Sequence, residues 1–258
     1  MKDNVHENHR ERMRDRFIQN GVDSMPPHEV LEVLLYYVMP RCDTNPIAHE
    51  LIDTFGSFSG VLEASVEDLA AVKGIGKRTA VFLKLFLDVN RFYEVDKTAN
   101  IKHFSTIEEV GEFLKPRFIG RRNEIVFMIS LDSKNDIIAA QILFEGDVNS
   151  ATLNIRQMIG TAIRLNAASV VIAHNHPGGV AVPSSKDMET TEYLFAIFKS
   201  LNIRLLDHFV FAGKDFTSIR QSRESYRRYD NKKRVYTFNS ETADFEDFFG
   251  SFDPFVKD

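Results

Sequence analysis

Apolar residues recur at helical spacing through the first hundred residues of the chain. The segments HEVLEVLLYYV (28–38) and NPIAHELIDTF (45–55) alternate polar and apolar positions with the period of an amphipathic helix. A longer segment, residues 77–93, has the same pattern and predicts a long helix. We therefore expect residues 1–98 to form a small all-α domain.

The pattern changes after residues 99–104, a short polar segment that we interpret as a linker. Two apolar, β-branched runs, 124–132 and 136–146, are separated by SKN, which predicts a β-hairpin. Residues 168–176 form a short apolar run, which is typical of a buried central strand. Because such runs alternate with amphipathic segments, we expect an α/β layered domain over residues 105–225.

The end of the chain, residues 226–258, has a different composition. A basic run from Arg220 to Arg234 precedes a segment with six acidic residues, one lysine and six phenylalanines. Chain ends are commonly disordered, but aromatic residues are scarce in disordered segments. Two interpretations therefore stay open for this acidic, Phe-rich tail: a disordered end, or a segment that docks on a partner or on the chain itself.

Composition excludes several classes of protein. The chain has 258 residues, 43% of them hydrophobic, and a formal net charge of −5, so it is not a polybasic nucleic-acid binder. Its single cysteine, Cys42, cannot form an internal disulfide or a cysteine cluster for structural zinc. The sequence shows no apolar signal segment and no apolar run near the ~20 residues that span a bilayer. We expect a cytoplasmic protein.

Two histidines and one aspartate have the spacing of a metal site. His174 and His176 end the apolar run, and a period of two places both side chains on one side of a strand. Asp187 follows in the first turn of the next predicted helix and can supply an oxygen ligand. Two histidines and one carboxylate leave a position for water, which is the ligand set of catalytic zinc. Alternatively, the histidines only pack, and Ser184 with Asp187 forms a helix capping box; the capping role is compatible with either interpretation.

The string HNHPGGVAVPSSKD (174–187) resembles the JAMM pattern, in which H-x-H is followed by seven residues, Ser, two residues and Asp. Over residues 9–220 the chain also resembles the RadC family. The segments that carry this resemblance are HRERMRDRF, FGSFSGVLEAS, VKGIGKRTA, LDSKNDIIAAQILFEG, RLNAASVVIAHNHPGG and LDHFVFAG. The resemblance implies a JAB/MPN domain, related to the cytidine-deaminase-like α/β layer, that binds zinc and hydrolyses amide bonds.

Three positions depart from the usual family sequence. Gly178 stands where the family usually has serine, Gln157 follows Arg156 where glutamate is frequent, and Asp147 follows Gly146 where threonine is usual. The metal ligands are unaffected by these changes. The three changes fall on positions where the family pattern implies substrate contacts.

The resemblance also assigns roles to residues outside the ligand set. It implies Glu124 as the general base, in preference to Glu145, and Ser184 as the donor to an oxyanion. Taken alone, Glu124 would be interpreted as a solvated residue. Asp207 and His208 match a family Asp-His pair, which we interpret as a buried pair that fixes a strand; as an alternative, His208 orients a metal ligand.

The segment VKGIGK (72–77) resembles a helix-hairpin-helix. In that motif Gly74 and Gly76 let backbone N–H groups approach a phosphate, and Lys77 adds charge. The alternative is a helix–helix turn that only packs. Residues 1–98 carry 12 basic and 16 acidic residues, so we expect any DNA binding here to be weak.

The leading hypothesis is a zinc-dependent metallopeptidase or isopeptidase-like hydrolase with an unidentified protein or peptide substrate. The alternative is a DNA-associated repair or recombination accessory protein with a non-catalytic metal site. A nuclease is a third hypothesis, but the tripeptide His-Asn-His does not support it. HNH nucleases draw those residues from well-separated positions.

Overall fold

The computed structural model describes residues 5–146 and 151–220, and it divides the chain into two compact units, Met1–Lys97 and Thr98–Asp258. The tail predicted at 226–258 lies outside the described residues. No helix of the described part is long and apolar enough to cross a membrane.

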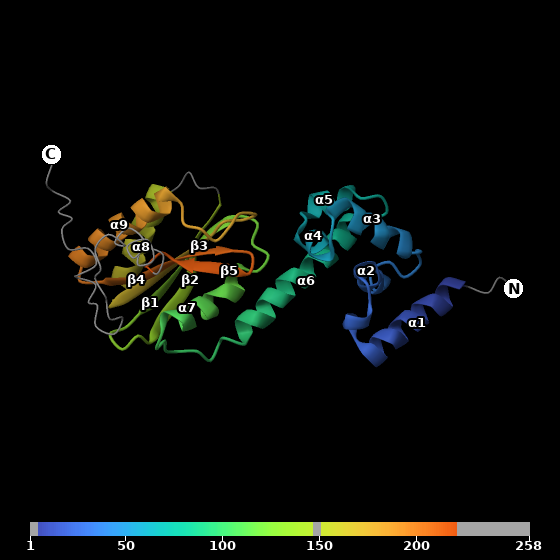
Figure 1. Ribbon diagram of the computed structural model, residues 1–258, viewed down its shortest axis with the longest axis horizontal. Helices are drawn as coiled ribbons and strands as arrows, with labels where there is room; N and C mark the ends of the chain where they lie inside the picture. Colours follow the sequence, from blue (N-terminus) through green and yellow to red (C-terminus); the bar gives the residue numbers. More distant parts are fainter. Residues whose placement is uncertain (1–4, 147–150, 221–258) are drawn as a thin grey trace, which may run out of the picture. The chain divides into compact units, whose positions relative to one another are not determined.

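The first unit contains helices only, among its described residues (Figure 1). Pro27 begins the second helix, where a missing N–H costs nothing, and Gly56, with φ of 78°, ends the third. Leu31, Leu51 and Leu83 are fully buried in its core. The elements are α1 (Val5–Asn20), η1 (Val22–Ser24), α2 (Pro27–Tyr36), α3 (Asn45–Phe55), α4 (Phe58–Glu63), α5 (Val66–Ala71) and α6 (Lys77–Asp96).

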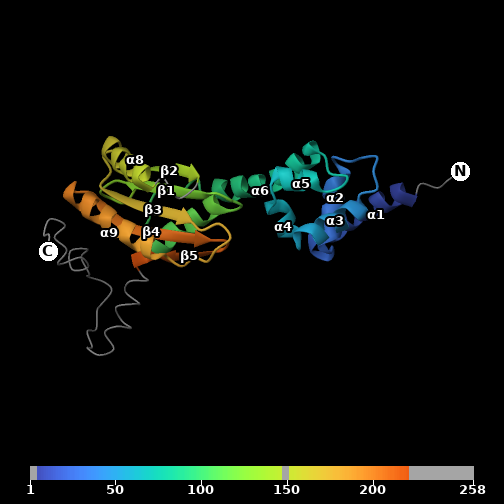
Figure 2. The ribbon, with the colours of Figure 1, turned by 90° about the horizontal axis from the view of Figure 1, so that it is seen from above.

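The second unit is a five-stranded sheet with helices. Its elements are α7 (Ile107–Leu114), η2 (Lys115–Phe118), β1 (Glu124–Leu131), β2 (Ile137–Gly146), α8 (Ala151–Arg164), β3 (Ser169–Asn175), α9 (Ser185–Ser200), β4 (Arg204–Ala212) and β5 (Asp215–Ser218). The strand order is β2-β1-β3-β4-β5 (Figure 2). Only β3 and β4 are parallel, with α9 between them in the chain, as a crossover connection requires. Every residue of β3 is buried, because it is the central strand of the sheet.

Helices cover both faces of the sheet, which gives three layers. On one face Val171 and Ala173 of β3 pack in a cluster with Phe113 of α7. The alternate residues of β3 reach the other face, where Ile172 packs in a cluster with Leu194 of α9. A mixed α/β domain preceded by a helical region confirms the predicted fold class.

The segment interpreted as a linker is partly built into the second unit. The backbone N–H of Ile137 donates to the carbonyl of Lys102 at 2.7 Å, and that of Phe104 donates to Asn135 at 3.4 Å. Phe104 itself is buried in the α7-side core. Residues 102–104 therefore pair with the β1–β2 hairpin, a long-range contact that no local pattern predicts.

Candidate metal centre

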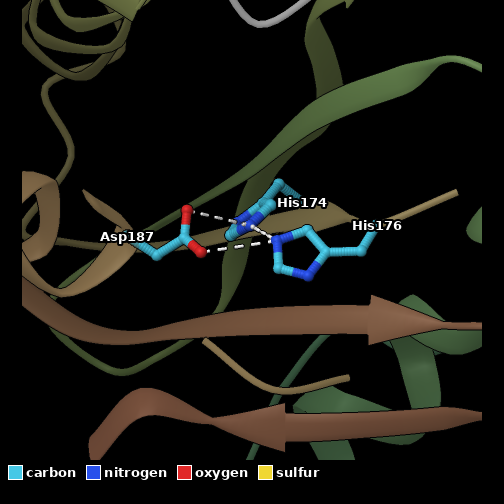
Figure 3. Close-up of side chains that lie close together, drawn as sticks. All are labelled: His174, His176 and Asp187. Atoms are coloured by element: carbon cyan, nitrogen blue, oxygen red, sulfur yellow. Dashed lines mark hydrogen bonds and ion pairs between the residues drawn. The ribbon is translucent and has the colours of Figure 1, made fainter. Parts of the chain in front are cut away.

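The side chains of His174, His176 and Asp187 point toward one another (Figure 3). The Nε2 atoms of the two histidines are 3.0 Å apart. Asp187 Oδ1 lies 3.3 Å from His174 Nε2, and Asp187 Oδ2 lies 3.4 Å from His176 Nε2. Within the described ranges, no other group of three such side chains has the spacing to hold a metal ion.

Local structure sets the place of each of these side chains. His174 occupies the end of β3 with the parity of Ile172, so it projects to the face covered by α9. A turn then reverses the chain, with Gly178 at φ of 69°, a left-handed conformation that favours glycine. Asp187 returns in the first turn of α9, beside the two histidines.

The predicted capping box is present at the start of α9. The backbone N–H of Asp187 donates to Ser184 Oγ at 3.2 Å, and that of Ser184 donates to Asp187 Oδ2 at 2.7 Å. Ser184 Oγ donates its own proton to Asp187 Oδ2 at 2.6 Å. The hydroxyl of Ser184 is thus directed at the carboxylate, and it orients Asp187 toward the histidines.

The geometry of the three groups fits a small divalent cation. Zinc–ligand distances of 2.0–2.1 Å correspond to a tetrahedral edge of about 3.3 Å, close to the three separations above. His176 Nδ1 lies 3.2 Å from the carbonyl oxygen of Val180. Since a carbonyl only accepts, Nδ1 carries the proton, which leaves a lone pair on Nε2. Nε2 of His176 is therefore available as a ligand atom.

The charge of Asp187 suits the same role. Burial alone would raise the pKa of this carboxyl group. The hydrogen bond and charge of His174, with the two hydrogen bonds from Ser184, outweigh burial and hold the pKa well below its usual value. Asp187 is therefore an anion throughout the physiological range and attracts a cation.

Glu124 lies on the same face of the sheet as the histidines. Val126 of β1 is opposite His174 of β3 in the antiparallel ladder. Glu124 begins β1 two residues before Val126, so its side chain projects to the same face as those of Val126 and His174. Glu145 is opposite Ile125 instead, so it belongs to the other face, and it pairs with Arg121 at 3.4 Å. The register therefore favours Glu124 over Glu145 as the candidate general base.

Asn175 is a residue whose role the sequence does not reveal. Its Oδ1 accepts from the backbone N–H of Ile125 at 2.8 Å, and its Nδ2 donates to the carbonyl of Asn123 at 3.1 Å. The buried amide therefore holds the backbone on both sides of Glu124. Its place between the two histidines is the only sequence signal.

Asp207 and His208 have separate environments. His208 is buried beside the candidate ligands, with Nε2 2.8 Å from His174 Nδ1 and Nδ1 2.7 Å from Thr191 Oγ1. Asp207 accepts hydrogen bonds from Ser218 Oγ and the backbone N–H of His208, both at 2.6 Å. The pair thus combines both interpretations: Asp207 fixes β4 to β5, and His208 contacts a candidate ligand. Thr191 was not singled out from the sequence.

The residues interpreted as a helix-hairpin-helix belong to the first unit. Gly74, with φ of 90°, and Gly76 lie in the turn between α5 and α6, and Lys77 is the first residue of α6. All three are exposed. A Cβ atom at Gly74 would lie 3.1 Å from Ile47 Cδ1, whereas one at Gly76 would meet nothing within 4 Å. Gly74 is therefore required by the backbone conformation and the close packing of the turn.

Comparison with known proteins gives matches along most of the chain. A family model described as a RadC-like JAB domain matches residues 104–225, and one described as UPF0758 N-terminal matches residues 6–81. A UPF0758 protein of Fusobacterium nucleatum is 31% identical over 84% of this chain and 97% of its own length. A UPF0758 protein of Polaromonas is 33% identical over 81% and 93%, and one of Bacillus pumilus is 32% identical over 83% and 95%.

Proposed function

Because this chain belongs to the UPF0758 family and carries its RadC-like JAB domain, we propose that it is a zinc-dependent hydrolase of the JAMM type that cleaves peptide or isopeptide bonds. The observation that carries the proposal is the spacing of the ligand atoms. The ligand atoms of His174, His176 and Asp187 lie 3.0–3.4 Å apart, which matches one zinc ion.

The single thiol, Cys42, makes the reducing cytoplasm the expected compartment.

Three protein ligands would leave room for solvent, as in catalytic rather than structural sites. A bound zinc ion would supply Lewis acidity, which lowers the pKa of a water molecule toward ~7. Glu124 is the base that would accept a proton from the attacking water and pass it to the leaving nitrogen as the C–N bond breaks. Asn175, through the backbone of Asn123 and Ile125, holds Glu124 in position for this transfer.

Ser184 has a first role in orienting Asp187, because its proton is donated to Oδ2 of that residue. To stabilise an oxyanion on the substrate carbonyl, the hydroxyl would rotate and give up that hydrogen bond. The backbone N–H of Ser184 would still hold Asp187 Oδ2. The capping and catalytic roles of Ser184 are therefore compatible but not simultaneous.

Zinc content of the purified chain tests the site. We expect about one zinc per wild-type chain, measured by atomic emission, because three ligand atoms converge. Asp187→Ala should lose the zinc, and Glu124→Gln should retain it, since Glu124 is not a ligand. Asp187→Asn keeps an oxygen acceptor for the capping box but removes the negative charge. Loss of zinc in this variant would therefore show that Asp187 is a ligand, because the helix cap is retained. A folded wild type that takes up no zinc on reconstitution would overturn the proposal.

Substrate cleavage then tests the chemistry. A screen of peptide and isopeptide substrates should find activity that Glu124→Gln lowers by 10²-fold or more while zinc remains bound. Zinc retention with no measurable hydrolysis of any substrate would instead favour a non-catalytic site.

DNA association is the second candidate function, and the exposed turn at Gly74 and Gly76, followed by Lys77, is the observation in its favour. If it holds, fluorescence anisotropy should show binding to duplex DNA that weakens with salt and is reduced by Lys77→Glu. That binding should be unaffected by Glu124→Gln. Binding that is equal in Lys77→Glu and the wild type would exclude this turn as the contact.

A further inference from the structure

A chain of buried hydrogen bonds links the backbone of one candidate ligand to the ring of another. Thr191 Oγ1 donates to the carbonyl oxygen of Asp187 at 2.6 Å and lies 2.7 Å from His208 Nδ1. His208 Nε2 in turn lies 2.8 Å from His174 Nδ1. Thr191, His208 and His174 are 8%, 5% and 8% exposed, so solvent does not compete for these contacts. We call these three residues the Thr191 relay.

The chemistry of each group fixes the direction of the relay. A carbonyl oxygen only accepts, so the one hydroxyl proton of Thr191 goes to Asp187. Thr191 Oγ1 must then accept from His208, which places the His208 proton on Nδ1. The Nε2 atom of a neutral His208 is left as an acceptor, and it receives the Nδ1 proton of His174. In a neutral His174 this leaves a lone pair on Nε2, the atom that lies 3.3 Å from Asp187 Oδ1. A cation that binds there displaces the additional proton with which Nε2 donates to Asp187 in the metal-free site.

The fold brings these groups together from three elements. Thr191 follows Asp187 by four residues on α9, so one turn of helix places its hydroxyl at the carbonyl of Asp187. His208 of β4 is opposite Ile172 in the parallel ladder, two residues from His174 and on the same face. The relay thus begins at one ligand residue and ends at another.

We propose that Thr191 and His208 are positioning residues for the metal: Thr191 selects the tautomer of His208, and His208 selects the tautomer of His174 that presents Nε2 to the ion. The proposal rests on the metal site proposed above. Val180 has the equivalent role for His176, through its carbonyl oxygen. Without the hydroxyl of Thr191, His208 can carry its proton on Nε2 in place of Nδ1. That Nε2–H would donate to His174 Nδ1, so the proton of His174 would lie on Nε2, the ligand atom.

Zinc affinity of matched variants tests the relay. Thr191→Val removes the hydroxyl with little change of shape, and Thr191→Ser keeps it. By competition with a chromophoric chelator, we expect Thr191→Val to raise the zinc Kd by roughly 10–100-fold and Thr191→Ser to stay within about threefold of the wild type. Thr161→Val removes another buried threonine hydroxyl, on α8, and should leave the Kd unchanged.

Histidine tautomers give a second readout that does not depend on any variant. In ¹⁵N-labelled, zinc-free wild type, long-range ¹H–¹⁵N spectra should show His208 and His174 both protonated on Nδ1. A His208 protonated on Nε2, or a Thr191→Val variant that binds zinc as tightly as the wild type, would overturn the relay and leave the hydrolase proposal intact. A wild type that binds no zinc would overturn both.

Discussion

Burial acts in opposite directions on the adjacent residues Asp207 and His208. It raises the pKa of Asp207 to about 6, although Ser218 and two backbone N–H groups donate to the carboxylate. It lowers the pKa of His208 well below the usual value, with the neighbouring His174 as the next cause. Burial thus shifts both side chains toward their neutral forms, although Asp207 is still ionised above about pH 6.

The raised pKa of Asp207 predicts a pH-dependent stability. The unfolded chain loses this proton near pH 4, whereas the folded protein keeps it until about pH 6. The contribution of Asp207 to the free energy of unfolding is thus full below pH 4 and falls as the pH rises from 4 to 6, by on the order of 1–3 kcal/mol. Urea unfolding of the wild type and Asp207→Asn across this range measures it. A difference between the two proteins that stays constant with pH would contradict the prediction.

At the scale of elements, α7 approaches β5 closely enough to require glycine. A Cβ atom at Gly111 of α7 would lie 2.5 Å from two ring carbons of Phe216. That ring also packs against Phe209 and Phe211, which limits the directions in which it can move away. Gly111 is therefore a packing residue of the sheet–helix interface, despite its helical position.

We expect Gly111→Ala to lower the free energy of unfolding by roughly 1–3 kcal/mol, because overpacking exceeds the gain in helix propensity. Gly160→Ala is the matched control. It lies in α8, where a Cβ atom would meet nothing within 4 Å, and should stabilise by about 0.5–1 kcal/mol. Urea unfolding measures both. In the double variant Gly111→Ala/Phe216→Leu the cost should be less than additive; full additivity would show that the ring is not the obstacle.

At the scale of the whole molecule, each of the two units has its own buried core. We therefore expect two transitions in differential scanning calorimetry. Zinc should raise the midpoint temperature of only the second unit's transition, by roughly 5–10 °C at a hundredfold excess over Kd. The reason is that zinc binding stabilises the folded state that holds the ligands. Leu69→Ala, in the core of the first unit, should lower only the other transition. A single transition that responds to both changes would contradict this view.

Elements and motifs with local contacts could be predicted from the sequence, whereas two buried polar residues with distant partners could not. The hairpin, the buried strand and the capping box at Ser184 were all predicted from local patterns, because their contacts join residues close in sequence. Asn175 and Thr191 were not singled out. Their partners, Ile125 and His208, are 50 and 17 residues away, and no local pattern records such a contact.

Hydrophobic period and motif spacing are properties of neighbouring residues, and they are enough to predict the layered α/β class, the helical first unit and the candidate ligand set. Which side chains share a face of the sheet, and which atoms donate hydrogen bonds, can be seen only in the folded chain. Folding brought Glu124 to the face of the histidines, turned Glu145 away, and connected Thr191 to His174 through His208. The physical reason is that sheet register and hydrogen-bond direction arise only when distant segments are packed together and screened from water.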